Sequence, residues 1–182
     1  EDVVVTISNQ GYAKRIPIDT YRSQGRGGKG VAGMKTKDDD FVEHLFIAST
    51  HHYLMAVTEK GQLYWLKTYQ VPEAGRTAKG RPLVNMINIA QGDRVCAVVA
   101  VKEFPEDNYL IITTDSGVIK KTPLSAFGNP RKGGIRAITL KENELVNAAK
   151  VTDGEQDIFM ASSSGLAIRF NESDIRTMGR TA

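Results

Sequence analysis

Cysteine is nearly absent from this sequence: Cys96 is the only one among its 182 residues. A lone thiol cannot form an internal disulfide, which excludes the disulfide-stabilised secreted scaffolds and favours a reducing compartment. Long apolar runs are also missing, because the longest, residues 95–101, is too short to span a bilayer. Residues 1–5 have neither the basic start nor the apolar stretch of a signal peptide. We therefore expect a cytoplasmic protein without a membrane partner.

A strong excess of charge of either sign is absent as well. The formal net charge is +3 and the isoelectric point is about 9.0, which alone does not argue for a nucleic-acid partner. Apolar residues make up 41% of the chain and charged residues 25%, proportions typical of a folded globular domain. Any argument for nucleic acid must therefore come from where the charges lie.

The sequence does contain an internal repeat. Four segments share an apolar strand, a polar turn that ends in glycine, and a second strand, and their turn glycines are Gly11, Gly61, Gly117 and Gly165, at intervals of 50, 56 and 48 residues. Glycine is favoured there because such hairpin turns require a positive φ. The interval is close to the ~40–50 residues of a four-stranded propeller blade.

A glycine-rich basic loop keeps register with these turns. Fourteen residues after the turn glycine come Gly25–Gly30, Gly75–Gly80 and, in the fourth unit, Gly179–Ala182. In the third unit the loop Gly128–Gly133 lies three residues earlier. A loop that recurs at one place in every unit indicates a shared role.

Further strands complete each unit, and little of the sequence is helical. The expected elements are apolar stretches after the loops at 31–34, 83–87 and 135–140, later strands at 41–47, 94–101 and 144–151, and one helical turn at 123–127. A four-stranded unit cannot cover its own apolar face, so the units must stack. We predict an all-β, propeller-like partial array of four-stranded blades spanning 1–182. The approximate blades are 3–50, 51–101, 102–152 and an incomplete 153–182, as part of a larger array, since closed propellers have four to eight blades.

The loop Gln24–Gly30 has the chemistry of a phosphate contact. Its glycines let the backbone approach an anion, and Arg26 and Lys29 add positive charge. Rotationally related loops would form a curved basic track suited to a bent duplex held by its backbone. The expected DNA-binding residues are Gln24, Gly25, Arg26, Gly27, Gly28, Lys29, Gly30, Arg76, Lys79, Arg81, Arg131, Lys132 and Arg180.

Two nucleotide-binding interpretations of this loop fail. Gly25, Gly27 and Gly30 match the spelling of a dinucleotide fingerprint, but no βαβ unit surrounds them. Gly30 is followed by Val31 and not by the lysine and hydroxyl residue of a P-loop.

Basic residues also recur just past the turn glycines. Lys14, Arg15, Lys120, Lys121 and Arg169 are secondary DNA-binding candidates, because alternation along a strand sends about half of such side chains to solvent. The competing interpretation is that they are edge-strand charges that prevent aggregation.

The sequence shows no catalytic constellation. His44, His51 and His52 lack metal-ligand spacing, and residues 38–40, a run of aspartates, are more typical of a solvated turn than of a cation site. Residues 162–164, three serines, fit a hairpin and not a nucleophile elbow. We expect neither a catalytic site, a metal nor a cofactor in this chain.

The motifs resemble those of one known family. QGRGGKG at Gln24–Gly30 is similar to the signature box, usually written QRRGGKG, of the C-terminal domain of bacterial DNA gyrase A, although Gly25 stands where that family usually has arginine or lysine. ISNQGYAKRIP, TTDSGVIKKTPLSAF and the final GRTA also resemble the family, so the likeness covers essentially the whole chain.

The resemblance implies a six-bladed β-pinwheel whose blades exchange strands and whose edge wraps duplex DNA for negative supercoiling. It implies partners, namely two A and two B subunits of an ATP-dependent type II topoisomerase, whose ATP, magnesium and cleavage tyrosine belong to other domains. Two alternatives remain open: the equivalent domain of topoisomerase IV, and a protein-interaction propeller whose basic loops meet an acidic partner.

Overall fold

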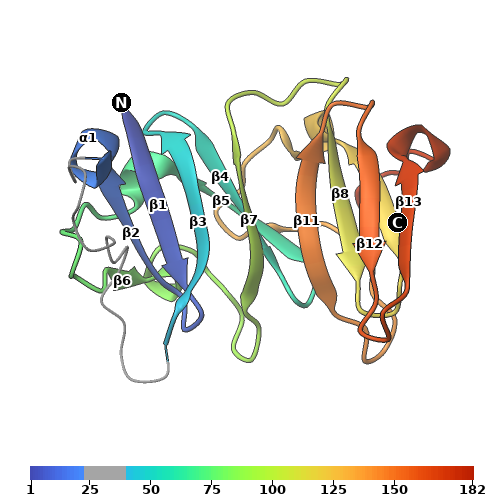
Figure 1. Ribbon diagram of the computed structural model, residues 1–182, viewed down its shortest axis with the longest axis horizontal. Helices are drawn as coiled ribbons and strands as arrows, with labels where there is room; N and C mark the ends of the chain where they lie inside the picture. The colour runs from blue at the N-terminus through green and yellow to red at the C-terminus, as the bar shows by residue number, and fades with distance from the viewer. Residues whose placement is uncertain (23–39) are drawn as a thin grey trace.

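The computed structural model describes residues 1–22 and 40–182. In these residues thirteen strands form four antiparallel sheets that follow one another along the molecule, from the blue amino terminus to the red carboxyl terminus in Figure 1. The first sheet has the order β3 (Val42–Ser49), β1 (Asp2–Ser8), β2 (Tyr12–Pro17) and β6 (Arg81–Pro82). The second has the order β10 (Ile135–Arg136), β5 (Gln62–Lys67), β4 (Tyr53–Thr58) and β7 (Val95–Val101). The third contains β11 (Val146–Thr152), β8 (Tyr109–Thr114) and β9 (Ile119–Pro123), and the fourth contains β12 (Asp157–Ala161) and β13 (Ala167–Asn171).

Short helical turns follow the second strand of every hairpin. They are α1 (Ile18–Arg22), η1 (Thr68–Gln70), η3 (Leu124–Phe127) and η4 (Glu172–Asp174), and a further turn, η2 (Leu83–Asn85), follows β6. The helical turn predicted at 123–127 is therefore confirmed, and the fold is the all-β, repeated-sheet architecture that the sequence indicates.

The four hairpin turns share the same glycine conformation and the same two hydrogen bonds. Gly11, Gly61, Gly117 and Gly165 have φ values of 86°, 85°, 85° and 87°, which confirms the prediction that these positions require a positive φ. Each glycine N–H donates to the carbonyl three residues earlier, at 2.9–3.1 Å. A hydroxyl at that same earlier position accepts a bond from the N–H just after the glycine; the hydroxyls belong to Ser8, Thr58, Thr114 and Ser162.

Neighbouring units exchange strands at their outer edges. β6 belongs to the second sequence unit, yet it pairs with β2 of the first sheet. β10 belongs to the third unit and pairs with β5 of the second sheet. Each of these two sheets thus takes its outermost strand from the unit that follows.

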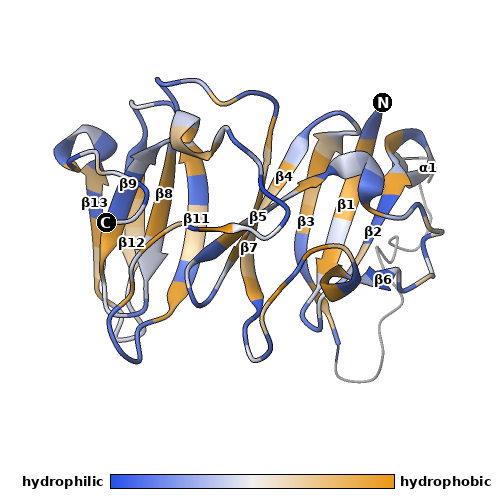
Figure 2. Cartoon of the chain, turned by 180° about the vertical axis from the view of Figure 1, so that it is seen from behind, coloured by the Kyte–Doolittle hydropathy of each residue, from blue (hydrophilic) through white to orange (hydrophobic). Residues whose placement is uncertain are grey.

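The core consists of the spaces between successive sheets. Along β4, Leu54 and Ala56 pack toward the first sheet, whereas Met55 and Val57 pack toward the third. Because the second sheet is covered on both faces, its strands are almost continuously apolar and not alternating. Figure 2 shows hydrophobic colour along much of the strands and hydrophilic colour over many of the connecting loops.

One predicted strand is wrong. The apolar stretch 83–87 contains the turn η2 in place of a strand. Leu83 and Ile87 are both buried, at 3% and 6% exposure, and the Ile87 N–H bonds to the Leu83 carbonyl. Leu83 and Ile87 therefore lie on one side of a helical turn and pack against the first sheet. Residues four apart share one face in a helical turn.

Candidate nucleic-acid interface

The loop expected to contribute most, Gln24–Gly30, lies outside the described residues, together with the apolar stretch at 31–34. The described part of the interface comprises the three corresponding loops of the later units. We call residues 75–80, 128–133 and 179–182 the rim loops.

The rim loops lie on the same side of the array. The first two lead into β6 and β10, which are the outermost strands of their sheets. The third lies against β9, because the Met178 N–H donates to the Lys121 carbonyl at 2.8 Å. At the opposite edges, β7 contacts both β3 and β11. The loops thus lie along the edges formed by β6, β10 and β9, away from the edges where β7 contacts β3 and β11.

Three of the expected DNA-binding cations are exposed on this side. Arg81 lies on β6, and Arg131 and Lys132 lie in the second rim loop. Among the described residues, none of the three has an ion-pair or hydrogen-bond partner for its side chain. Lys79, in the first rim loop, lies over the Tyr12 ring with its Nζ 5.0 Å from the ring centre. Such charges remain available to a polyanion without first breaking an internal ion pair.

Two of the three rim-loop arginines, Arg76 and Arg180, are partly engaged with the protein backbone. Arg76 donates from Nη2 to the carbonyl of Thr20 in α1. Arg180 donates from Nη1 to the carbonyl of Arg136 at 2.8 Å. A guanidinium has five N–H donors, so the bond from Arg180 leaves further donors that can reach a phosphate.

Lys14, a secondary candidate, does not face solvent. Its side chain is fully buried on β2, and Nζ donates to the carbonyls of Gly75, Arg76 and Ala78 at 2.9, 2.7 and 2.8 Å. Burial lowers the pKa of this amine to about 8, whereas the three carbonyl dipoles favour the ammonium. This placement is at odds with the expectation that Lys14 contacts DNA, because all three of its donors are used inside the protein.

Lys120 and Lys121 are buried as well, at 3% and 5% exposure. Lys120 donates to the carbonyls of Ala137 and Arg180, and burial, with a smaller effect from the Arg180 charge, lowers its pKa to about 8. Lys121 lies 3.3 Å from the fully buried carboxylate of Glu172. This placement is at odds with the expectation that either lysine contacts DNA, because both side chains lie inside the protein and strand alternation does not bring them to solvent.

Arg15 belongs to a series of inter-unit hydrogen bonds. Four residues after the turn glycine, each of the first three units places a donor against a carbonyl of the next unit. The bonds run from Arg15 Nε to Val71 at 2.8 Å, from Trp65 Nε1 to Phe127 at 2.9 Å, and from Lys121 Nζ to Glu172 at 3.2 Å. Arg15 is also 3.5 Å from the Glu73 carboxylate. Sequence reasoning missed this series, although the constant offset from the glycine was visible.

Arg169 occupies the same offset in the fourth unit and differs from its counterparts. Its side chain is 73% exposed and pairs with Asp157 across the β12–β13 hairpin, with Nη2 2.6 Å from Oδ2. The hydrogen bonds and charge of Arg169 hold the pKa of the Asp157 carboxyl below its ordinary value. Of the secondary candidates, Arg169 is the one that remains on the surface.

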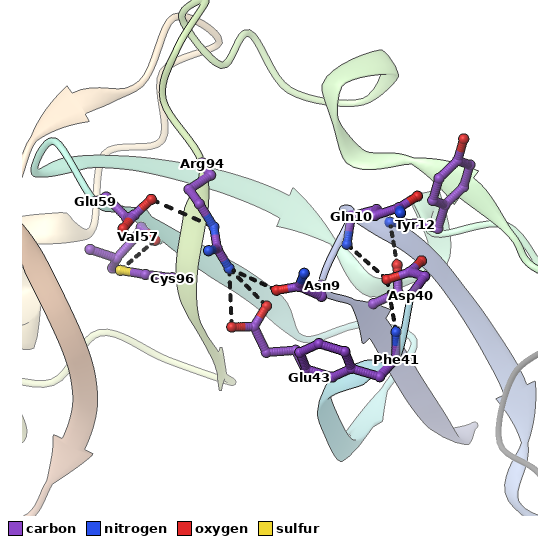
Figure 3. A network of polar contacts seen from close by, with 11 residues as sticks. Asn9, Gln10, Tyr12, Asp40, Phe41, Glu43, Val57, Glu59, Arg94 and Cys96 are labelled. Atoms are coloured by element: carbon purple, nitrogen blue, oxygen red, sulfur yellow. Dashed lines mark hydrogen bonds and ion pairs between the residues drawn. The ribbon is translucent and has the colours of Figure 1, made fainter. Parts of the chain in front are cut away.

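Arg94 links the first and second sheets near their hairpin turns (Figure 3). Its Nη2 lies 3.0 Å from Oε2 of Glu43 on β3, and its Nε lies 3.5 Å from Glu59. Beside it, a cavity of about 130 Å³ is lined by residues of the β1–β2 turn and by Leu83. Since this arginine already faces two carboxylates, we do not count it among the DNA-binding cations.

The described residues contain no group of three or more histidine, cysteine, aspartate or glutamate side chains arranged to hold a metal ion. Desolvation is the main cause that lowers the pKa of His44, which lies on β3 opposite Ile7 of β1. No described helix is long and apolar enough to cross a membrane.

Comparison with known proteins identifies the architecture. The model of the family described as DNA gyrase C-terminal domain, beta-propeller, matches residues 2–49, 52–102, 108–153 and 156–182. The chain belongs to this family. The four matched segments correspond to the four repeats of the sequence, which confirms the resemblance carried by the QGRGGKG box and its flanking motifs.

Full-length relatives and solved structures agree with this assignment. The DNA gyrase A protein of Halalkalibacterium halodurans is 47% identical over all 182 residues, which make up 22% of that protein. The chain therefore spans about a fifth of the length of this curated relative. A structure titled as a DNA gyrase A C-terminal domain superposes with a TM-score of 0.78 at 28% identity, covering all of this chain and 58% of that one. The C-terminal domain of DNA topoisomerase IV superposes with a TM-score of 0.80 at 26% identity and 55% coverage of that chain.

Proposed function

We propose that this gyrase C-terminal domain binds duplex DNA along the outer edges of its sheets and bends the duplex around the array. The observation that carries the proposal is the common placement of the rim loops, with Arg81, Arg131 and Lys132 exposed on that side and unpaired with described residues. Cations placed along one edge of the array are suited to contact phosphates of a bent duplex.

Recognition of this kind is largely independent of DNA sequence. Base edges are read by a helix or a β-ribbon that enters a groove, and the helices of the described residues have at most five residues. Arginine and lysine on short loops instead contact phosphates, which position the duplex without reading it.

The relatives of the chain support a proposal for the task of the domain. We propose that it presents a wrapped segment to a parent ATP-dependent type II topoisomerase in the cytoplasm, made of two A and two B subunits, which introduces negative supercoils. ATP and magnesium would act in other parts of that enzyme, and we propose no cofactor or catalytic site within this chain.

Salt dependence of binding tests the interface. Combined alanine substitution of Arg81, Arg131 and Lys132 should reduce the slope of log K against log salt by about 0.9 for each phosphate that the protein no longer neutralises. The matched control replaces three exposed lysines away from the rim loops, Lys60, Lys102 and Lys150, by alanine. Fluorescence anisotropy of a labelled duplex, titrated at several salt concentrations, measures the slope for the variant and for the control. An equal change of slope in the two variants would show that only total charge matters, and would contradict the proposed interface.

The box Gln24–Gly30 and the wrapping itself need a topological measurement. The chain is incubated with relaxed circular DNA, a nicking-closing enzyme is added, and the change in linking number is read on a gel. We expect trapped writhe with the natural chain and less with Arg26→Ala and Lys29→Ala combined. Binding without a change in linking number would leave simple association only.

Two alternative functions have distinct outcomes. A protein-interaction propeller would bind DNA only at micromolar or weaker affinity at low salt and would trap no writhe. The topoisomerase IV domain is not separated by the fold, since both solved structures superpose closely. The 47% identity to a DNA gyrase A protein favours gyrase.

A further inference from the structure

Lys14 of the first unit holds the first rim loop, residues 75–80, through hydrogen bonds to its backbone. Lys14 lies on β2 of the first sheet, and the carbonyls that accept its three hydrogen bonds all belong to residues 75–78 of the second unit. The end of the loop is fixed as well. Gly80 has a φ of +82° and presses so closely on β2 that a Cβ there would lie 2.7 Å from the Ala13 carbonyl carbon.

The same device recurs two units later. Lys120, like Lys14, stands three residues after its turn glycine and is buried. Its Nζ donates to the Arg180 carbonyl, which corresponds in the repeat to the Arg76 carbonyl held by Lys14. Thr139 adds two bonds to the same loop, from its N–H to the Ala182 carbonyl at 3.1 Å and from its hydroxyl to the Thr181 carbonyl at 2.6 Å.

The intervening unit lacks the lysine and differs in its loop. Tyr64 stands three residues after Gly61, and its ring packs against the backbone of Gly134, where a Cβ would lie 2.6 Å from the ring. The loop that follows this unit, Gly128–Gly133, is the one shifted three residues earlier, and it does not share the Gly-Arg-Thr-Ala sequence of the other two. A lysine three residues after the turn glycine therefore goes with a Gly-Arg-Thr-Ala loop in the next unit, and a tyrosine there goes with the shifted loop.

This arrangement orients the loop toward an anion. The ammonium draws the carbonyl oxygens of residues 75, 76 and 78 inward. Carbonyl oxygens carry partial negative charge, so their removal from the outer surface lowers the repulsion that a phosphate would meet there. It also fixes the backbone that bears Arg76 and Lys79, so that less conformational entropy is lost when the loop binds.

We propose that Lys14 and Lys120 are positioning residues that preorganise the rim loop of the following unit for phosphate contact, without touching the phosphate themselves. A unit with a lysine three residues after its turn glycine is then followed by a unit whose rim loop has the sequence Gly-Arg-Thr-Ala and is fixed by that lysine. This inference rests on the proposed function, because it assumes that the rim loops contact DNA.

Two variants and a control test the proposal. Lys14→Met and Lys120→Met keep the length of the side chain and remove the ammonium, and Lys102→Met changes an exposed lysine as the control. Amide hydrogen exchange followed by mass spectrometry should show faster exchange at residues 75–80 in the first variant alone and at 179–182 in the second alone. Peptides from β4 and β8 should exchange as in the natural chain, which shows that the rest of the fold is intact.

DNA binding by the same variants separates positioning from contact. The rim-loop charges remain in Lys14→Met, so the slope of log K against log salt should stay unchanged, while the affinity should fall about tenfold at every salt concentration because the loop must be ordered on binding. Replacement of Arg76 and Lys79 by alanine should instead reduce the slope.

Each outcome bears on one proposal. If the natural chain does not bind DNA, the proposed function fails, whatever the lysine variants do. If it binds, and Lys14→Met speeds exchange at 75–80 without a loss of affinity, the lysine is only structural and the inference is overturned. A reduced salt slope in Lys14→Met would also overturn it, since the lysine would then count as a phosphate contact.

Discussion

The indole Nε1 of Trp65 donates a hydrogen bond of 2.9 Å to the backbone carbonyl of Phe127 and so ties the second sheet to the turn that follows β9 of the third. Phe127 is fully buried in the core between these sheets. Trp65 is the only tryptophan of the chain, so its fluorescence reports on this one junction.

Substitution of Trp65 by phenylalanine should weaken the junction. The change removes the donor and leaves the Phe127 carbonyl without it, which costs about 1–3 kcal/mol of unfolding free energy. Chemical denaturation followed by far-ultraviolet circular dichroism measures the loss. Tyr69→Phe, at a side chain that is 54% exposed, is the control and should change stability by less than about 0.5 kcal/mol. Equal stability of Trp65→Phe and the natural chain would contradict a structural role for this bond.

Two glycines with nearly equal φ should respond differently to alanine. Gly80 and Gly11 have φ values of +82° and +86°, but a Cβ on Gly80 would overlap the backbone of Ala13, whereas a Cβ on Gly11 would meet open space. We expect Gly11→Ala to cost about 1 kcal/mol, from the backbone conformation alone, and Gly80→Ala about 2–4 kcal/mol, because overlap adds to it. Thermal and urea unfolding of both variants provide the comparison, and similar losses would refute the close approach of this loop to β2.

The turn carboxylate Glu144 should make stability dependent on pH in acid. Its side chain is buried and accepts bonds from the Ser116 hydroxyl, the Lys141 N–H and the Thr114 hydroxyl, which hold the pKa of the carboxyl below its ordinary 4.5. A carboxyl that ionises more readily in the folded state stabilises it above pH 4.5, and that contribution is lost as the pH falls through the folded-state pKa.

Glu144→Gln should therefore lower the unfolding free energy at pH 7 and flatten its decline below pH 4.5. Urea titrations at pH values from 3 to 7 check this, with Glu142→Gln, at an exposed neighbour, as the control. A variant with the same acid dependence as the natural chain would exclude Glu144 as its source.

The thiol of Cys96 should be almost unreactive in the folded protein. Burial, aided by the negative charge of Glu59, raises its pKa to about 12, and its Sγ lies 3.5 Å from the Val57 carbonyl. Because the thiolate is the reacting form, alkylation by iodoacetamide at pH 8 should be at least about tenfold slower than in denaturant. Reaction at the denatured rate would mean that the second sheet opens far more readily than its packing implies.

The sequence predicted the hairpins well because their cause is local. A positive φ at Gly11 or Gly117 and a hydroxyl at Ser8 or Thr114 act within five residues, so the signal is present in a short window. The strands after the rim loops were harder to predict, because β6 and β10 have two residues each and show no periodicity.

The buried lysines could not be placed from the sequence by charge alone. Lys14 next to Arg15 resembles a solvated edge, and only the backbone carbonyls of the next unit, far along the chain, show that Lys14 is buried and that Arg15 is hydrogen-bonded to Val71. The available signal was positional, since Lys14 and Lys120 stand at one offset in the repeat. The box at Gln24–Gly30 falls outside the described residues, so its role stays a prediction.

The strand exchange at β6 and β10 sets a rule for how such a chain can gain or lose repeats. Recombination that replaces one repeat by a foreign one changes two sheets at once: the sheet of that repeat and the preceding sheet. The preceding sheet changes because its outer strand is encoded in the replaced repeat. An in-frame duplication of a full repeat adds one sheet and preserves every pairing, wherever in the repeat the breakpoint falls. Arrays of this kind should therefore evolve by whole-repeat duplication more readily than by exchange of single repeats between distant relatives.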